Sequence, residues 1–119
     1  MRSLIDANVI LRYMLNDHQE MAEKAKIAIR SGVFTTPEVL AEVVYVLQGV
    51  YKVPREVAAK SLLALLTEVH VEHKNVCIEA LTIYADKRLD FVDCILIARN
   101  HILGENIITF DKKLSKNLI

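Results

Sequence analysis

Two carboxylates in this sequence follow short apolar runs, a placement from which a side chain can do chemistry. Asp6 comes directly after Ser3-Leu4-Ile5, and Asp111 comes two residues after Ile107-Ile108-Thr109. Runs this short, bounded by polar residues, predict small buried strands. Since ligands of parallel sheets bind outside the carboxyl ends of the strands, we expect both acids at one binding edge.

Three further carboxylates lie on strongly apolar helical segments. Glu42 lies at the edge of an apolar helix face, and Asp93 precedes the apolar run Cys94–Ala98. Asp90 lies about one helical turn before Asp93, on roughly the same side. Because carboxylates are almost never fully buried without a partner, these acids are candidates for a shared site.

Each acid also has a purely structural interpretation. Asp6 could be a turn residue, Asp90 and Asp111 could cap helices, and Glu42 could pair with a basic side chain. If the acids instead converge, two carboxylates about 4 Å apart repel by about 4 kcal/mol at an effective dielectric of about 20. Such a cluster takes up protons or binds a cation, and oxygen ligands favour Mg²⁺ or Mn²⁺ over zinc.

Other chemistries lack their motifs in this chain. There is no CxxC pair and no HExxH for zinc, no GxSxG for a serine nucleophile, and no glycine-rich phosphate loop. A phosphoacceptor signalling domain has a similar length and fold class. It requires an acidic pair after the first strand and a lone Asp after the third, and only Asp6 fits.

The elements that must position the acids alternate between short strands and helices. Strands are predicted at Ser3–Ile5, Val33–Phe34, Val69–Val71 and Ile107–Thr109. Helices are predicted over 7–15, 21–29, 37–50, 54–69, 76–84 and 91–102, with a short one from Asp111. The fold class expected from this order is α/β, a three-layer α/β/α sandwich with a small central parallel sheet. The helix at 91–102 is apolar nearly all round and is expected to be central.

Length and composition favour one domain over residues 1–119. The chain has 15 basic and 15 acidic residues and is 53% hydrophobic, which excludes a disordered tail or a disulfide scaffold. Its apolar runs are far shorter than the ~20 residues that span a bilayer, and no signal peptide is visible, so we expect a cytoplasmic protein. Cys77 and Cys94 are expected to be buried free thiols.

The order of the acidic motifs resembles that of the PIN-domain ribonucleases, and more narrowly the VapC-type toxins of prokaryotic toxin–antitoxin pairs. The resemblance covers essentially the whole chain. It rests on four motifs: Leu4-Ile5-Asp6-Ala7-Asn8, Leu40-Ala41-Glu42-Val43-Val44, Asp90-Phe91-Val92-Asp93-Cys94 and Thr109-Phe110-Asp111. Each motif is weak by itself, and the four together in this order form a specific pattern.

The resemblance implies an endoribonuclease that uses Mg²⁺ or Mn²⁺ and cleaves single-stranded or looped RNA. It carries over Asp6, Glu42, Asp93 and Asp111 as the catalytic acids, with Asp6, Asp93 and Asp111 holding the metal. In this scheme the metal activates a water molecule and Glu42 orients or deprotonates it. Supporting roles fall to Asn8, Thr109 and Asp90.

The resemblance also implies partners. Toxins of this type usually form homodimers and are silenced by an antitoxin protein. The zero net charge argues against indiscriminate binding to long duplexes but leaves room for local contacts with RNA. Basic candidates for such contacts are Arg12, Lys112, Lys113 and Lys116. Tyr45 and Tyr51 are expected to complete the core rather than face a partner. The alternative to an enzyme is a PIN-like scaffold that binds RNA or a partner without cutting.

Overall fold

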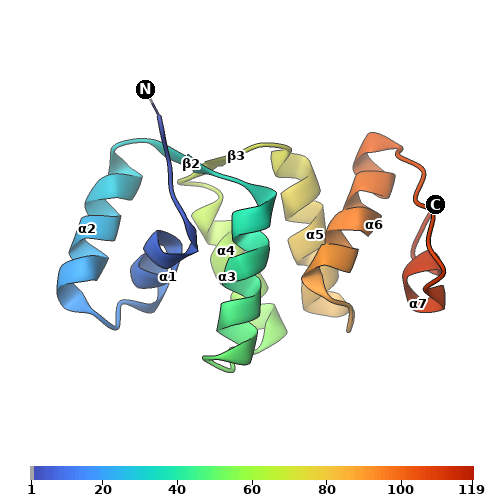
Figure 1. Cartoon of the computed structure of the whole chain (residues 1–119), viewed down its shortest axis with the longest axis horizontal. Helices are drawn as coiled ribbons and strands as arrows, with labels where there is room; N and C mark the ends of the chain where they lie inside the picture. Colours follow the sequence, from blue (N-terminus) through green and yellow to red (C-terminus); the bar gives the residue numbers. More distant parts are fainter. Residues whose placement is uncertain (1) are drawn as a thin grey trace.

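The computed structural model describes residues 2–119 and places short strands and helices in alternation. The strands are β1 (Ser3–Leu4), β2 (Val33–Thr35) and β3 (His70–Val71). The helices are α1 (Ala7–Leu15), α2 (Gln19–Arg30), α3 (Pro37–Gly49), α4 (Arg55–Leu65), α5 (Lys74–Asp86), α6 (Phe91–Leu103) and α7 (Lys112–Ser115). The helices lie side by side below the strands in a flat molecule of 45 × 33 × 18 Å (Figure 1).

The three strands form a parallel sheet in the order β1-β2-β3. Ser3 lies opposite Val33, and Phe34 lies opposite His70. Each strand leads within a few residues into the helix that follows it, α1, α3 or α5. The predicted α/β/α class with a small parallel sheet is therefore confirmed. No helix within residues 2–119 has the length and apolar character that crossing a membrane requires.

The fourth predicted strand is wrong. Residues 107–109 form no strand and pair with no strand among residues 2–119. The chain instead leaves α6 at Gly104 and runs outside that helix to α7 (Figure 1). The side-chain pattern of Ile107-Ile108-Thr109 is that of a strand, but no sheet edge lies within its reach in this arrangement.

Helix starts follow the local chemistry of the sequence. The Asp6 carboxylate accepts a hydrogen bond from the Val9 N–H at 3.1 Å, which caps α1. The Thr36 hydroxyl accepts one from the Val39 N–H at 3.2 Å, with Pro37 at the first helical position of α3. These caps fix where each helix departs from the end of its strand.

The hydrophobic core contains buried residues from all of the helices α1 to α7. Tyr84 and Phe91 are buried and meet edge to face, with ring centroids 5.8 Å apart. Cys77 and Cys94 are buried and free, as predicted, and burial raises the pKa of each thiol to about 11.

Two expectations about burial are wrong. Helix α6 packs against α5 and α3 on one side only, so its other face, including Val92, Ile102 and Leu103, is exposed. Tyr45 and Tyr51 are also exposed, because they lie on the side of the α3 region that faces away from the core.

Arg55 at the start of α4 holds the loop that leads into α6. Its guanidinium donates hydrogen bonds to the backbone carbonyls of Tyr84 at 3.0 Å, Lys87 at 2.7 Å and Leu89. The same group stacks 3.7 Å from the centre of the Tyr84 ring. The planar guanidinium group can donate these hydrogen bonds and stack on the ring at the same time, whereas a lysine ammonium cannot.

Arg55→Lys is expected to lower the free energy of unfolding by about 2 kcal/mol, because hydrogen bonds from a charged group and the stacking contact are lost. Urea unfolding followed by circular dichroism measures this. The control Lys60→Arg, at an exposed position of the same helix, should change it by less than about 0.5 kcal/mol. Equal effects of the two substitutions would contradict a clamping role for Arg55.

Candidate functional site

Asp6 and Asn8 lie at the amino end of α1, directly beyond β1. Both side chains are exposed, although one oxygen of Asp6 is engaged in capping the helix. The structural alternative considered for Asp6 from the sequence was a turn residue, and the structure shows a helix cap instead. The second carboxylate oxygen of Asp6 accepts no hydrogen bond from residues 2–119 and faces solvent as a free acceptor.

Glu42 lies in the middle of α3 and is exposed. No ion pair connects it to a basic side chain within residues 2–119, so the interpretation as a salt-bridge partner does not hold in this arrangement. Helix α3 packs against α1, which places Glu42 in the same part of the molecule as Asp6 (Figure 1).

Asp90 and Asp93 lie at the start of α6. Asp90 occupies the N-cap position, but its side chain makes no capping hydrogen bond and is exposed. Asp93 lies in the first turn and is half-buried. Burial, and then the negative charges of Asp90 and Asp111, raise the pKa of Asp93 above its ordinary value.

Asp111 lies at the amino end of α7. One oxygen accepts hydrogen bonds from the Lys113 N–H at 2.9 Å and the Leu114 N–H at 3.1 Å, so Asp111 caps this short helix. The Thr109 hydroxyl accepts a hydrogen bond from the Asp111 N–H at 3.0 Å. Thr109 therefore supports the backbone of Asp111, as its predicted supporting role implies.

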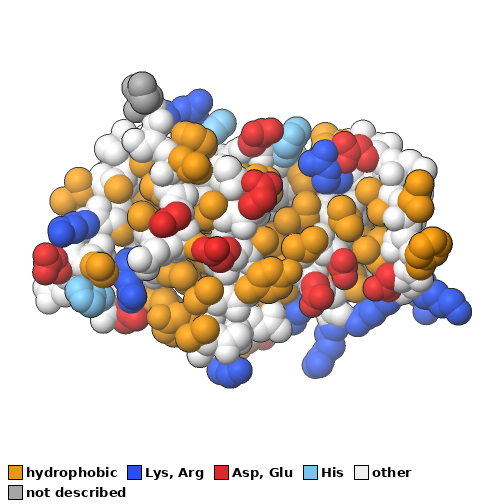
Figure 2. Space-filling model, in the orientation of Figure 1, with side chains coloured by type: hydrophobic (Ala, Val, Ile, Leu, Met, Phe, Trp, Pro, Cys, Tyr) orange, Lys and Arg blue, Asp and Glu red, His pale blue; other side chains and the backbone are white. Residues whose placement is uncertain are grey.

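The acids thus fall into two halves. Asp90 and Asp111 lie close enough to Asp93 for their charges to raise its pKa. Asp6 and Glu42 lie instead at the start of α1 and in the middle of α3. Within residues 2–119 no three His, Cys, Asp or Glu side chains come close enough to hold a metal ion. Acidic side chains are accordingly spread over the visible face rather than gathered at one point (Figure 2).

The expected single cluster is therefore not assembled in one copy of the chain. Its physical cause is the missing fourth strand: Asp111 follows residues 107–109, which lie outside α6 instead of beside β1. The four acids supply carboxylate oxygens, which are the ligands that Mg²⁺ and Mn²⁺ prefer. Within residues 2–119 of one copy, however, these oxygens do not come together around one position.

The basic candidates are partly engaged. Arg12 forms an ion pair with Asp17 at 3.0 Å, and its Nε atom is buried without a hydrogen-bond partner. The Lys113 ammonium donates to the Arg88 carbonyl. Lys112 and Lys116 are exposed and make no ion pair within the described chain.

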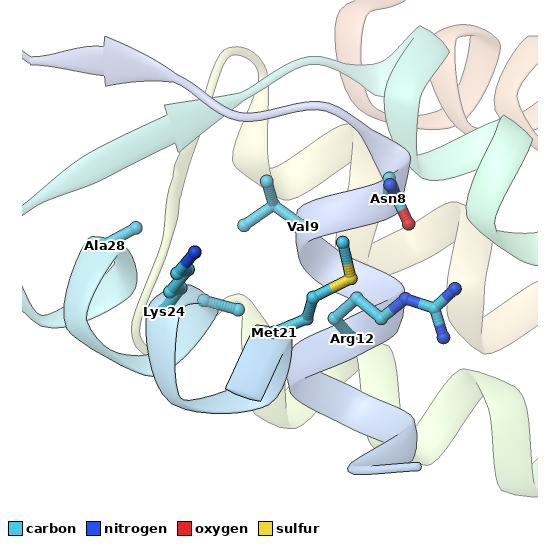
Figure 3. A pocket seen from close by; sticks show the side chains of 7 residues that line it. Asn8, Val9, Arg12, Met21, Lys24 and Ala28 are labelled. Carbon is cyan, nitrogen blue, oxygen red and sulfur yellow. The ribbon is translucent and has the colours of Figure 1, made fainter. Parts of the chain in front are cut away.

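A hollow of about 200 Å³ lies between α1 and α2. Val9, Met21 and Ala28 form apolar walls, and Asn8, Arg12 and Lys24 lie around them (Figure 3). The two cations make this hollow a place where an anionic group can approach the end of β1. Lys24 was not predicted as a site residue from the sequence. The only sequence feature that could have indicated it is its position about one helical turn after Met21.

A second hollow, of about 510 Å³, lies at the carboxyl ends of β2 and β3. Its polar lining includes Glu38, Glu72, His73 and Arg99, none of which the sequence singled out. The His73 ring lies 3.4 Å from the Glu72 carboxylate, and Arg99 forms an ion pair with Glu105. Parallel sheets bind ligands at this edge, which is the one signal that could have pointed to these residues.

A parallel sheet whose strands lead into acid-bearing helices defines the chain as an α/β protein. The sequence matches the PIN domain over residues 3–117, and the chain belongs to this family. PIN domains are typically metal-dependent nucleases that act on nucleic acid, so the family supports a nuclease. No curated protein and no solved structure matched the chain.

Asp93→Asn is expected to raise the free energy of unfolding at pH 7 by about 0.5 kcal/mol, the size of a like-charge contact on a helix. Because the folded-state pKa of Asp93 is raised, its stability penalty is absent below the pKa of an unfolded aspartate, develops as the pH rises from there to the folded-state pKa, and is complete above it. The gain should therefore shrink as the pH is lowered. Urea unfolding at a series of pH values measures this.

Glu23→Gln, at an exposed position of α2, is the matched control and should give no pH-dependent gain. A stability gain from Asp93→Asn that stays constant as the pH falls would contradict a charge effect at Asp93.

Proposed function

We propose that this protein is an endoribonuclease that cleaves single-stranded or looped RNA with the help of Mg²⁺ or Mn²⁺. The observation that carries the proposal is the match to a family of nucleases over residues 3–117, in a chain where the four expected acids are all present. Asp6, Glu42, Asp93 and Asp111 are the proposed catalytic acids, with Asp6, Asp93 and Asp111 as the metal ligands.

The surroundings of these residues support the division of roles. Glu42 carries no ion pair within the described residues, which leaves its carboxylate available to accept a proton from water. Asp6 keeps one free oxygen, and Asp90 has a side chain that caps nothing. The Thr109 hydroxyl accepts a hydrogen bond from the Asp111 N–H, and Asn8, two residues after Asp6, is the proposed support for the first acid. Since one copy does not gather these acids, we derive no reaction step through a bound metal.

Single-stranded or looped RNA suits the charge distribution. A chain of zero net charge lacks the broad positive surface that duplex binding uses, and unpaired bases can be splayed into a cleft. Arg12 beside the α1–α2 hollow and the exposed Lys112 and Lys116 are the proposed backbone contacts, with Lys113 beside them.

We further propose that the protein is the toxin of a cytoplasmic toxin–antitoxin pair and forms homodimers. Support comes from apolar side chains that remain exposed at the end of α3, namely Tyr45, Val50 and Tyr51, which offer contact area to an antitoxin protein. A small open reading frame with a DNA-binding pattern next to the gene is the expected genetic sign.

A second candidate function is a PIN-like scaffold that binds RNA or a partner without cutting. The specific observation in its favour is the separation of the acids into two halves within one copy. Binding by the basic side chains requires no such assembly.

Purified protein is expected to cleave a mixed RNA pool in the presence of Mn²⁺ or Mg²⁺ and to stop when a chelator is added. Asp6→Asn and Asp93→Asn should each lower the cleavage rate by about 100-fold or more, as loss of a general acid–base or ligand group does. Gel analysis of the products over time measures the rate, and Glu23→Gln should cleave at the unmodified rate.

The outcomes separate the candidates. RNA that is bound but remains intact with Mn²⁺ and with chelator alike favours the scaffold and refutes the nuclease. If Asp6→Asn and Asp93→Asn unfold, as judged by circular dichroism, the two acids are structural.

A further inference from the structure

The edge of β1 that faces away from β2 is an open position in the sheet. The Ile5 N–H donates to the Phe34 carbonyl at 2.9 Å, so Ile5 presents its peptide groups to β2. Peptide groups of successive residues in a strand point to opposite sides, so those of Leu4 point to the free edge. Leu4 is also 55% exposed. Such an edge is a template for a further strand.

Residues 107–110 have the properties of a strand that lacks a sheet. They belong to no helix or strand, and exposure alternates along them, with Ile107 and Thr109 half-buried and Ile108 and Phe110 exposed by 86% and 100%. Their backbone N–H groups donate to no acceptor within residues 2–119. A fully exposed phenylalanine close to an exposed isoleucine is an apolar surface without a partner within residues 2–119. Figure 2 shows hydrophobic side chains at the rim of the molecule beyond α6.

The β1 edge of the same copy is out of reach for this segment. Only Gly104–Asn106 connect it to α6, which packs against α5 and α3. The chain after it is tied to α6, because the His101 ring lies 2.7 Å from the Asn117 carbonyl and the Ile119 N–H donates to Asn100 at 2.7 Å. Figure 1 shows β1 and this segment toward opposite ends of the row of helices.

We propose that residues 107–110 of one copy add as a parallel fourth strand to the β1 edge of a second copy, forming a closed homodimer. Because the edge and the segment lie toward opposite ends of each copy, two copies with antiparallel long axes make both contacts at once. Main-chain hydrogen bonds to Leu4 supply the pairing, and Ile108 and Phe110 leave water.

The proposed strand brings the two halves of the acidic set together, a consequence that rests on the proposed function. With Leu4 opposite Thr109, Asp111 lies beside Asp6 of the second copy, since each acid follows two residues later. Asp93 and Asp90 accompany Asp111, and Glu42 accompanies Asp6. Each site is then shared between copies, which accounts for the absence of a three-ligand group in one copy.

The first experiment measures mass by light scattering after size exclusion. The unmodified protein is expected to have twice the mass of one chain, and the double variant Ile108→Lys with Phe110→Lys the mass of one chain. Both residues are exposed in a single copy, so its circular dichroism spectrum should be unchanged. The matched control Ile119→Lys, also an exposed apolar residue near the end of the chain, should stay dimeric.

The second experiment mixes inactive copies. Asp6→Asn and Asp93→Asn copies, each inactive alone, are denatured together in equal amounts and refolded as dimers. Random pairing makes about half of the dimers mixed, and each mixed dimer has one intact site of two, so about one quarter of the unmodified activity should return.

An unmodified protein that has the mass of one chain, or a double variant that remains dimeric, overturns the proposed dimer. A concentration-dependent series of larger species overturns its closed form. Dimers without restored activity place each site within one copy and overturn the shared site. If the unmodified protein cuts no RNA at all, the proposed function fails, while the mass measurement still decides the dimer.

Discussion

Parallel pairing at β1 is the constraint on which the arrangement of the acids depends. The strands are only two or three residues long, and each one passes almost at once into a helix. The sheet therefore sets the starting points of α1, α3 and α5. A strand placed beside β1 brings the acid after it to Asp6, and a strand left unpaired carries its acid elsewhere. Arg55 fixes the position of Asp90 and Asp93, because its hydrogen bonds hold the loop that leads into α6.

Local signals in the sequence predicted most elements because each signal acts over a few residues. Thr36-Pro37 marked the start of α3 through a side-chain cap and a fixed backbone angle. Residues 107–109 show the limit of such signals. Their sequence predicts a strand, which the structure does not form, because the partner that a strand pairs with is a tertiary property that no local pattern contains. The exposure of Val92 and Ile102 on α6 could not be predicted for the same reason, because the type of an apolar residue does not determine which neighbour covers it.

The candidate site was predictable as a set of residues and not as an arrangement. Asp6 and Asp111 lie after apolar runs, and both cap helices, which was expected as the structural role of Asp111 but not of Asp6. A cap uses one carboxylate oxygen and leaves the other available, so the two roles are compatible. Asp90 has the position of a cap without the hydrogen bond. Arg55 escaped prediction because its three acceptors are backbone carbonyls 29 to 34 residues away, and sequence says nothing about where carbonyls point.

Electrostatics favours the separated acids in a single chain without a cation. Two carboxylates about 4 Å apart repel by about 4 kcal/mol at an effective dielectric of about 20, so a copy by itself gains by keeping Asp6 away from Asp93 and Asp111. Burying one large apolar side chain contributes about 1.5–3 kcal/mol. The free energy gained by burying Ile108 and Phe110 in a fourth strand is therefore large enough to offset that repulsion. A bound cation would remove most of it. Strand addition and cation binding then favour each other, because each lowers the free-energy cost of the other, and a chain with neither keeps its acids apart.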